Sequence, residues 1–472
     1  MPQTPPRDAR ELAGELLART RATGPCIADL FDSLAEASGL DSRDRGLALE
    51  IANGVVRHRR TLDAVLAAFS NRPIVKSPVP LRILLRLGAY QLLFLDRVPG
   101  FAAVDETVEL AKRWARPRIK KHPASIAGFV NGILRALAGG VQTIERGDQS
   151  AHSARRVIER PVCESLVLLD RDVLADPQTE PAEHLADAYS FNSWLAARWV
   201  DRLGLPQARE LARAQNRRAS LTLRVNTLRT TIEAVRDMLI GDGVDAAYVR
   251  GHVPLLRVLE GDALNSKAMQ LGLIQPQDPW SASVVGKLHV KPGMTVLDRC
   301  AAPGTKTSQI VELMEDRGTI FAVDVAPEGL ERITTNVRRM GGHIVRSILA
   351  EDLPKTLMDA SSIDRALADV PCSNSGVLAR RPEARWRIDA ESLAELNRTQ
   401  RELLMDALNW VAPGGKVVYS TCSIEPEEND QVVQYAIHRR RGQVRLLEEK
   451  ATLPSLRDDH DGGYWAILER VR

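Results

Sequence analysis

Two short segments place a cysteine just after a β-rich run, beside small polar residues. They are Asp369-Val370-Pro371-Cys372-Ser373 and Ser420-Thr421-Cys422-Ser423. A thiolate is a strong nucleophile, but the pKa of a free cysteine is about 8.5, so a site that uses one must favour ionisation or supply a base. Most free cysteines are simply small buried apolar side chains. Two cysteines that both follow strands are harder to explain by packing, and they indicate nucleophilic chemistry.

A third segment, 296–307 (VLDRCAAPGTKT), has the features of a ligand-binding turn between a strand and a helix. Its small residues and Gly304 let a ligand approach the backbone, and the helix predicted to begin near Lys306 offers free N–H groups. The segment is neither a GxGxxG fingerprint nor a Walker loop, because the GK[ST] ending is missing. A dinucleotide ligand is therefore disfavoured.

Acidic residues end several of the predicted strands. Asp324 closes the strand after the turn, 20 residues beyond Gly304 (324 − 304), where a carboxylate can accept both hydroxyls of a ribose. Asp352 follows the third strand, where it could meet an adenine amino group, and Asp298 and Asp369 end two others. Any one of them could be a capping or surface residue. Together they predict a nucleoside-sized site.

The elements that must position these residues are strands and helices in alternation, from about residue 281 onwards. The β-rich runs are 295–297, 319–323, 345–349, 365–367 and 416–419, and helical stretches such as 328–340 and 391–411 separate most of them. This order is typical of a parallel sheet with helices on both faces, and in such sheets ligands bind at the carboxyl ends of the strands.

The first part of the chain has helical patterning throughout. Apolar residues recur at helical spacing over 81–95, Asp41 and Ser42 precede another helical stretch, and 128–137 has the same texture. Residues 138–181 mix Gly-Gly, charges and scattered prolines, which favours a linker. Helical patterning returns over 183–205, and 220–226 (SLTLRVN) alternates like a strand.

Length and composition indicate a globular protein of two or three domains. The chain has 472 residues, 44% hydrophobic and 26% charged. No apolar run reaches the roughly 18 residues of a membrane helix, and the polar, proline-rich start lacks the core of a signal peptide, so we expect a cytoplasmic protein without a membrane partner. Five dispersed cysteines argue against a disulfide framework, and the absence of CxxC and HExxH patterns argues against a metal site.

The net charge of +3 does not by itself indicate a polyanion partner. Two basic runs are more suggestive: 112–121 (KRWARPRIKK) and 380–387 (RRPEARWR). Each could be an ordinary solvated surface. Because Trp114 and Trp386 are interleaved with the basic residues, the runs also fit a surface that binds a nucleic-acid backbone and stacks bases.

The combination of CAAPGTKT, DVPCS and STCS resembles the RNA cytosine-C5 methyltransferases of the NOL1/NOP2/Sun group. The resemblance runs from about residue 270 to the end and includes Gln277-Asp278. Three N-terminal stretches, RDRGLALEIANGVVRHRRTLD, LRLGAYQLLFLDRVPGFAAVDETVELAK and FVNGILRAL, resemble the NusB-like RNA-binding domain. That domain is fused to this catalytic domain in the Sun/RsmB enzymes, which modify bacterial small-subunit ribosomal RNA.

The resemblance implies an all-α NusB-like N-terminal domain, a small α+β segment and an α/β Rossmann-like domain that binds S-adenosylmethionine. We expect the NusB-like domain over 1–140, a linker over 141–182, the small RNA-binding segment over 183–275 and the methyltransferase domain over 276–472. The sequence does not indicate an oligomeric state.

The resemblance also implies roles for individual residues. Cys422 would add to carbon 6 of a cytosine so that carbon 5 can take the methyl group, and Cys372 would assist release of the product. The DNA enzymes place the nucleophile in the PC element, so motif position alone leaves the order open. The cofactor site would be lined by Cys300, Ala301, Ala302, Pro303, Gly304, Thr305, Lys306, Asp324, Asp352 and Asp369. The substrate would be unstacked RNA, in particular 16S ribosomal RNA.

The chain departs from the family pattern at a few positions. Thr305 replaces a glycine, Asn374-Ser375 stands where Gly-Thr is more usual, and Arg299 replaces an apolar residue. These changes affect the expected cofactor affinity more than the chemistry, because no catalytic group is lost. The alternative from another class is a catalytically silent NusB-like RNA-binding factor. A DNA cytosine methyltransferase is a second alternative, against which the NusB-like part argues.

Overall fold

The computed structural model describes residues 5–20, 26–114, 118–119, 122–145, 151–160, 165–358 and 363–472. Cys163 and part of the first basic run (115–117, 120 and 121) lie outside the described residues. The chain divides into two compact units. Unit 1 comprises Met1–Arg218 and Arg381–Arg387, and unit 2 comprises Ala219–Arg380 and Ile388–Arg472.

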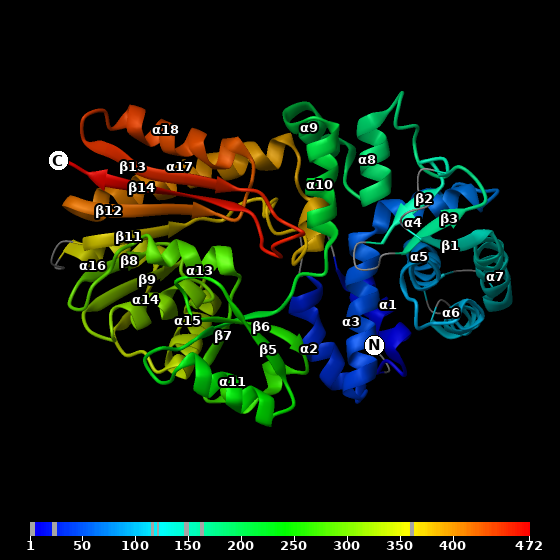
Figure 1. The fold of residues 1–472 in the computed structure, drawn as a ribbon, viewed down its shortest axis with the longest axis horizontal. Helices are drawn as coiled ribbons and strands as arrows, with labels where there is room; N and C mark the ends of the chain where they lie inside the picture. Colours follow the sequence, from blue (N-terminus) through cyan, green and yellow to red (C-terminus); the bar gives the residue numbers. More distant parts are fainter. Residues whose placement is uncertain are drawn as a thin grey trace. The chain divides into compact units, whose positions relative to one another are not determined.

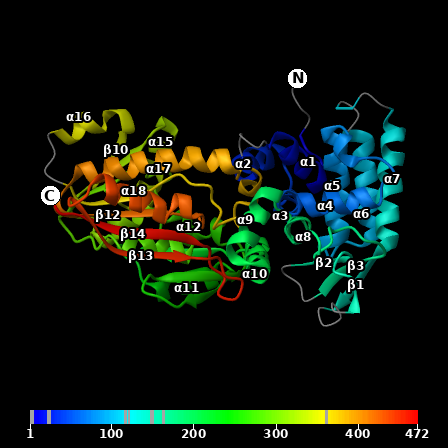
Figure 2. The ribbon, with the colours of Figure 1, turned by 90° about the horizontal axis from the view of Figure 1, so that it is seen from above.

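Unit 1 begins with a helical bundle, as predicted (Figure 2). Asp41 caps the third helix by accepting a hydrogen bond from the backbone N–H of Asp44. The helices share one apolar core, to which Leu62, Leu84 and Leu134 contribute fully buried side chains. The elements are α1 (Ala9–Arg19), α2 (Ile27–Ser38), α3 (Ser42–Arg57), α4 (Arg59–Ala68), η1 (Ile74–Lys76), α5 (Val79–Phe94), α6 (Gly100–Trp114) and α7 (Pro123–Gly140).

The remainder of unit 1 contains a small antiparallel sheet and more helices. The strands β1 (Val141–Glu145), β2 (Val157–Glu159) and β3 (Ser165–Leu169) pair in the order β1-β3-β2, within the segment that the sequence predicts as a linker. The helices are α8 (Pro181–Tyr189), α9 (Ser193–Leu203), α10 (Leu205–Asn216) and the short η5 (Pro382–Trp386). Arg385 of η5 is fully buried and donates to the backbone carbonyls of Arg57, Ser190 and Gln215, so η5 is fixed within unit 1.

The two basic runs are not free positive surfaces in the part of the chain that the structure describes. Lys112, Arg113 and Arg118 each contact a carboxylate. Trp114 is buried and donates to Glu15, so the prediction that it stacks bases is wrong. Of the second run, Arg385 is buried as described above. The spacing of the basic residues could not show this for Arg113 and Arg118, because their partners Asp8 and Glu15 lie 105 and 103 residues away. The partner of Lys112, Glu109, lies only three residues away.

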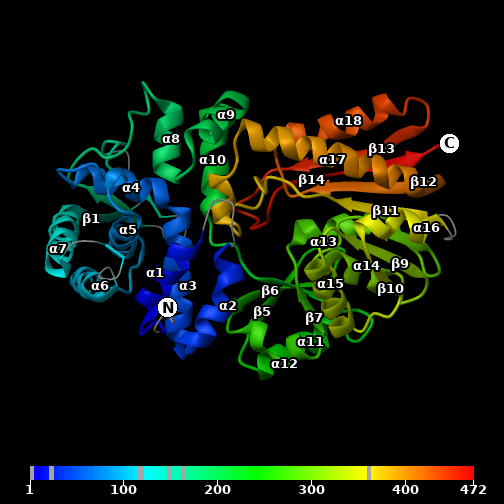
Figure 3. The ribbon, with the colours of Figure 1, turned by 180° about the vertical axis from the view of Figure 1, so that it is seen from behind.

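Unit 2 begins with a four-stranded antiparallel sheet in the order β5-β6-β4-β7, with the short helices beside it (Figure 3). The predicted strand over 220–226 is β4 (Thr222–Val225). The other elements are β5 (Asp245–Val249), β6 (Leu255–Glu260), β7 (Ile274–Pro276), α11 (Ile232–Gly241), η3 (Ala263–Asn265) and α12 (Lys267–Gln270).

A seven-stranded sheet forms the centre of unit 2, in the order β10-β9-β8-β11-β12-β14-β13 (Figure 1). The five predicted strands are present and parallel: β8 (Thr295–Asp298), β9 (Thr319–Asp324), β10 (Val345–Leu349), β11 (Ile363–Asp369) and β12 (Val411–Thr421). The sequence patterns did not predict β13 (Val444–Thr452) and β14 (Gly463–Arg470), which are antiparallel to their neighbours.

Helices cover both faces of this sheet, as predicted. Alternate residues of a strand face opposite sides, so Val417 packs with α17 (Ala390–Trp410) and α18 (Asp430–Arg439), and Val418 packs on the other face. That second face is covered by α13 (Pro279–Gly286), α14 (Thr305–Leu313) and α15 (Pro327–Met340). The shorter elements are η4 (Ala350–Asp352), α16 (Leu353–Met358) and η6 (Pro426–Glu428).

The described residues contain no helix that is both long and apolar enough to cross a membrane. Over the same ranges, no three metal-binding side chains cluster together.

Candidate active site

The ends of β11 and β12 bring the two predicted cysteines together. These strands are parallel neighbours, and Asp369 pairs in register with Ser420. Cys372 and Cys422 follow a few residues later, and their Sγ atoms lie 3.0 Å apart as free thiols. The two sulfur atoms share a hydrogen bond, and they are close enough to act on the same ligand.

Asn374 connects the two cysteine loops. Its Oδ1 accepts a hydrogen bond from Cys422 Sγ at 3.1 Å, and its Nδ2 donates to the carbonyl of Cys372 at 3.0 Å. Its backbone is left-handed (φ 62°), a conformation that glycine adopts freely and asparagine tolerates better than most residues. The departure from the family's glycine is therefore compatible with the same loop shape.

A buried carboxylate, Glu428 of η6, holds both loops in place. Its Oε1 accepts hydrogen bonds from the backbone N–H of Ser373 at 2.8 Å and from Gln400 Nε2 at 2.9 Å. Its Oε2 accepts from the hydroxyls of Ser373 and Ser423. These two serines directly follow the two cysteines, so one carboxylate fixes both segments. Sequence patterning missed Glu428, although a glutamate six residues after Cys422 was visible.

The charges around the thiols are distributed unevenly. A hydrogen bond with Cys422 and burial raise the pKa of Cys372 well above its ordinary value, so Cys372 keeps its proton at neutral pH. Lys306 Nζ lies 2.6 Å from Asp369 Oδ2. Burial lowers the pKa of Lys306, but the Asp369 carboxylate outweighs it, and the net shift is upward. The site therefore contains a permanent ammonium group, which favours a nearby thiolate.

The turn after β8 has the predicted geometry. Gly304 takes the left-handed conformation (φ 95°) and precedes α14, whose first residue is Thr305. Thr305 is helical, so replacing a glycine there causes no backbone strain. Cys300 lies in the same turn, and burial raises its pKa to about 12, so it remains a neutral thiol. Arg299 forms an ion pair with Asp406 (Nε–Oδ2 2.5 Å).

Asp298, at the end of β8, has an incomplete set of partners. Its Oδ2 accepts a hydrogen bond from Thr307 Oγ1 at 2.7 Å, whereas its buried Oδ1 has no partner within the described residues. Burial raises the pKa of Asp298 to about 7. An unsatisfied buried oxygen beside a helix N-terminus indicates that a ligand with a donor group completes this site.

The other two predicted carboxylates lie at the expected strand ends. Asp324 ends β9 and accepts hydrogen bonds from the backbone N–H groups of Ala326 at 3.1 Å and Ala302 at 3.4 Å. A side chain at position 329 would lie 2.5 Å from Asp324 Oδ1, so Gly329 makes room for this carboxylate. Asp352 ends η4 after β10, and its side chain is about half exposed (49%).

The predicted Gln277-Asp278 element fixes the chain around the thiol loop. Asp278 caps α13 and accepts from Arg380 at 3.1 Å, and Arg380 also contacts Asp461. Gln277 Nε2 donates to Gln309 at 2.8 Å. The Asp278 contact holds the chain at Arg380, beyond the loop that carries Cys372, and the Gln277 contact holds α14.

Five parallel strands with helices on both faces form a Rossmann-like domain, and the family model that matches this domain makes it a methyltransferase domain. Three family models match consecutive parts of the chain: the NusB family at 7–139, the ferredoxin-like domain of RsmF/B-like methyltransferases at 191–254, and 16S rRNA methyltransferase RsmB/F at 285–460. The chain belongs to the RsmB/Sun family of 16S ribosomal RNA methyltransferases.

Relatives and one solved structure match nearly the whole chain. The probable ribosomal RNA small subunit methyltransferase B of Synechocystis sp. is 31% identical, over 90% of this chain and 88% of its own. Ribosomal RNA small subunit methyltransferase B of Yersinia pseudotuberculosis is 28% identical, over 97% and 98%. The crystal structure of PH0851 matches with a TM-score of 0.76 and 25% identity, over 100% of this chain and 99% of its own.

Proposed function

We propose that this protein methylates carbon 5 of a cytosine in 16S ribosomal RNA through a covalent bond between cysteine and carbon 6. The observation that carries the proposal is the pair of thiols 3.0 Å apart at the ends of β11 and β12. A methyltransferase that acts on a ready nucleophile, such as an amine, has no need of two thiols. Carbon 5 of cytosine is a poor nucleophile, and a thiolate added to carbon 6 makes it reactive.

The residues at the strand ends fit S-adenosylmethionine. The free Oδ1 of Asp298 can accept a donor group, Asp324 can accept the ribose hydroxyls, and Asp352 can meet the adenine amino group. The turn 300–306 would form the wall of this site, since Gly304 and the α14 N-terminus leave backbone N–H groups available. When bound, the cofactor supplies an electrophilic methyl group.

The thiols would act in sequence on the base. Cys422 Sγ forms a bond to carbon 6, which gives carbon 5 the electrons to take the methyl group. A base then takes the carbon 5 proton, and the electrons of that bond re-form the double bond between carbons 5 and 6 and expel the Cys422 thiolate. Cys372 is protonated at neutral pH because its pKa is raised, and its Sγ lies 3.0 Å from the Cys422 sulfur, so it can donate a proton to that sulfur as it departs. The assignment of Cys422 as nucleophile rests on the family resemblance, and the protonated state of Cys372 agrees with it.

We further propose a division of labour along the chain: NusB-like helices over 1–140, a connecting segment over 141–182, a small RNA-binding segment over 183–275 and the methyltransferase over 276–472. The base must leave any stack before a thiol reaches carbon 6, so the substrate is single-stranded or loop RNA. Unit 1 and the small segment would hold the flanking nucleotides.

The test is methyl transfer from labelled S-adenosylmethionine to unmodified small-subunit RNA, with identification of the product nucleoside. We expect 5-methylcytidine from the wild type, no transfer by Cys422→Ala, and an RNA–protein adduct on denaturing gels for Cys372→Ala. Cys26→Ala in unit 1 is the control and should behave as the wild type. If the wild type binds RNA but transfers no methyl group, the protein is a silent RNA-binding factor and the proposal fails.

A further inference from the structure

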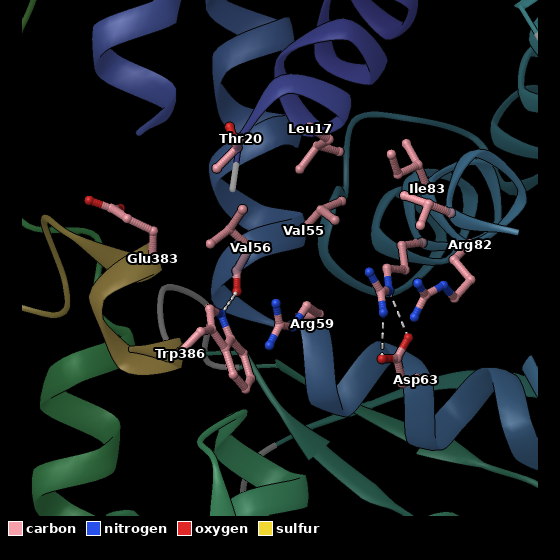
Figure 4. A pocket seen from close by; sticks show the side chains of 12 residues that line it. Leu17, Thr20, Val55, Val56, Arg59, Asp63, Arg82, Ile83, Glu383 and Trp386 are labelled. Atoms are coloured by element: carbon pink, nitrogen blue, oxygen red, sulfur yellow. Dashed lines mark hydrogen bonds and ion pairs between the residues drawn. The ribbon is translucent and has the colours of Figure 1, made fainter. Parts of the chain in front are cut away.

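Unit 1 contains a pocket that none of the roles described above uses (Figure 4). It has a volume of about 440 Å³ and lies between α1, α3, α4, α5 and η5. Three arginines, Arg59, Arg82 and Arg86, line it together with Trp386 and one close carboxylate, Asp63. This size lies within the roughly 300–1,000 Å³ of small-ligand sites and is sufficient for one nucleotide.

The positive charges in the pocket exceed the negative ones. Arg86 forms a two-pronged ion pair with Asp63, with both N–O distances 2.7 Å. Within the described residues, neither Arg59 nor Arg82 forms an ion pair, and the buried Nε of Arg82 has no hydrogen-bond partner. The only other acidic side chain of the lining, Glu383, points away from the arginines in Figure 4.

The arginines also destabilise one another. Burial and the neighbouring charge of Arg86 lower the pKa of Arg59 to about 10. A guanidinium in such surroundings gains from an anion, because a bound negative charge offsets both the burial and the repulsion. The pocket therefore has an excess of positive charge that a bound anion would balance.

An aromatic ring holds one of the arginines in position. The Arg59 guanidinium lies 3.8 Å from the centre of the Trp386 ring, and Trp386 Nε1 donates to the carbonyl of Val56 at 3.0 Å. In Figure 4, Arg59 lies between Trp386 and the side of the pocket that carries Arg82 and Asp63. Guanidinium planes and indole rings are the surfaces on which RNA bases stack.

We propose that this pocket binds one nucleotide of the RNA substrate, with a backbone phosphate held by Arg59 and Arg82 beside Trp386. The choice of RNA rests on the proposed function, since phosphate chemistry alone would also fit free phosphate. The described basic residues of the run 112–121 already have acidic partners. Arg59 and Arg82 do not, and they are therefore better suited to an RNA backbone.

The experiment measures binding of unmodified small-subunit RNA to the full chain as a function of salt. Arg82→Ala and Arg59→Ala together should weaken binding about tenfold, which corresponds to the loss of one charge-assisted contact. The slope of log K against log salt should fall by about 0.7 for each single-strand phosphate lost. Arg82→Lys should retain most of the affinity, and Arg135→Ala, an exposed arginine on α7, should leave affinity and slope unchanged.

Three further results distinguish RNA binding in the pocket from a catalytic role, from binding of free phosphate, and from failure of the proposed function. Methyl transfer at saturating RNA should keep its kcat while the KM for RNA rises, and a lost kcat with unchanged RNA affinity overturns the pocket proposal. Thermal melting with inorganic phosphate is the second reading: if phosphate stabilises the wild type but not the double variant while RNA affinity is unchanged, the site takes free phosphate and the RNA assignment is wrong. If the wild type binds RNA without methylating it, the proposed function fails, and the binding measurement still decides the pocket.

Discussion

The thiol site of unit 2 and the arginine pocket of unit 1 differ in whether their polar groups have partners within the protein. Around the thiols, almost every group has a partner in the protein: Glu428 accepts from four donors, and Lys306 is paired with Asp369. In the pocket, Arg59 and Arg82 have no acidic partner within the described chain. Groups that act on bonds are held in fixed geometry, whereas groups that attract a polyanion remain available.

The largest effect should come from breaking the network at the thiols. Glu428→Gln keeps the size of the side chain but replaces one acceptor oxygen by an NH2 group, which only donates. The remaining oxygen cannot accept from all the donors that Glu428 serves. We expect a loss of methyl transfer of at least about 100-fold and of stability by about 2–3 kcal/mol. Product analysis and urea unfolding measure the two effects.

A matched control separates a local effect from a general loss of charge. Glu395→Gln removes an exposed carboxylate from α17 and should leave both quantities unchanged. Because Glu428 acts through the cysteine loops, its substitution should also alter the alkylation rates of Cys372 and Cys422 in the folded protein. Full activity of Glu428→Gln would show that the loops keep their positions without it.

The next effect concerns Asp298, whose buried Oδ1 has no hydrogen-bond partner within the described residues. Its pKa in the folded protein is about 7, against 3.8 for an unperturbed aspartate, so its contribution to stability is full below pH 4 and is lost as the pH rises through 7. The shift of about three units sets an upper bound of about 4 kcal/mol on that loss. Asp298→Asn should therefore flatten the pH dependence of unfolding between pH 4 and 7.

Urea unfolding at several pH values tests this expectation. Asp237→Asn, an exposed position on α11, is the control and should keep the slope of the wild type. Because the free oxygen of Asp298 is expected to meet the cofactor, the asparagine variant should also bind S-adenosylmethionine more weakly in calorimetry. An unchanged slope in the Asp298 variant would show that the carboxylate is ionised throughout, with water or another group at its free oxygen.

A smaller effect is expected at Asn374, where two substitutions separate the role of the left-handed backbone from that of the side-chain amide. Asn374→Ala forces an alanine into a left-handed backbone and removes the bonds to Cys422 and to the carbonyl of Cys372, so we expect a loss of about 1–2 kcal/mol. Asn374→Gly removes the same two hydrogen bonds but tolerates the left-handed backbone, so it should lose about 1 kcal/mol less than the alanine variant and keep most of its activity. If both variants lose activity equally, the amide itself is required.

The sequence could predict the parallel strands, the turn at Gly304 and the meeting of the two cysteines, because each depends on local pattern or on the rule that parallel strands end at one edge. It could not predict β14, which pairs antiparallel with the distant strand β12, or β13, which pairs antiparallel with β14. The sequence also did not predict Glu428 or the ion pairs of Arg113 and Arg118, since the partners of these groups are decided by tertiary structure. Arg385 lies in a basic run that indicates a surface position, but its side chain is fully buried.

The smallest effect should have the opposite sign, and it tests the comparison most directly. Asp63→Asn removes the carboxylate that competes with RNA for Arg86, and the pair is partly buried, with side-chain exposures of 23% for Asp63 and 13% for Arg86. We expect stability to fall by about 1 kcal/mol and RNA affinity to rise a few-fold, with a salt slope steeper by about 0.7. Removal of a partner at the thiol site weakens function, whereas removal of a partner here strengthens it, because the pocket's charges serve a ligand. If Asp63→Asn weakens RNA binding instead, Asp63 positions Arg86 for the RNA, and the pocket is built more like the thiol site than its unpaired arginines indicate.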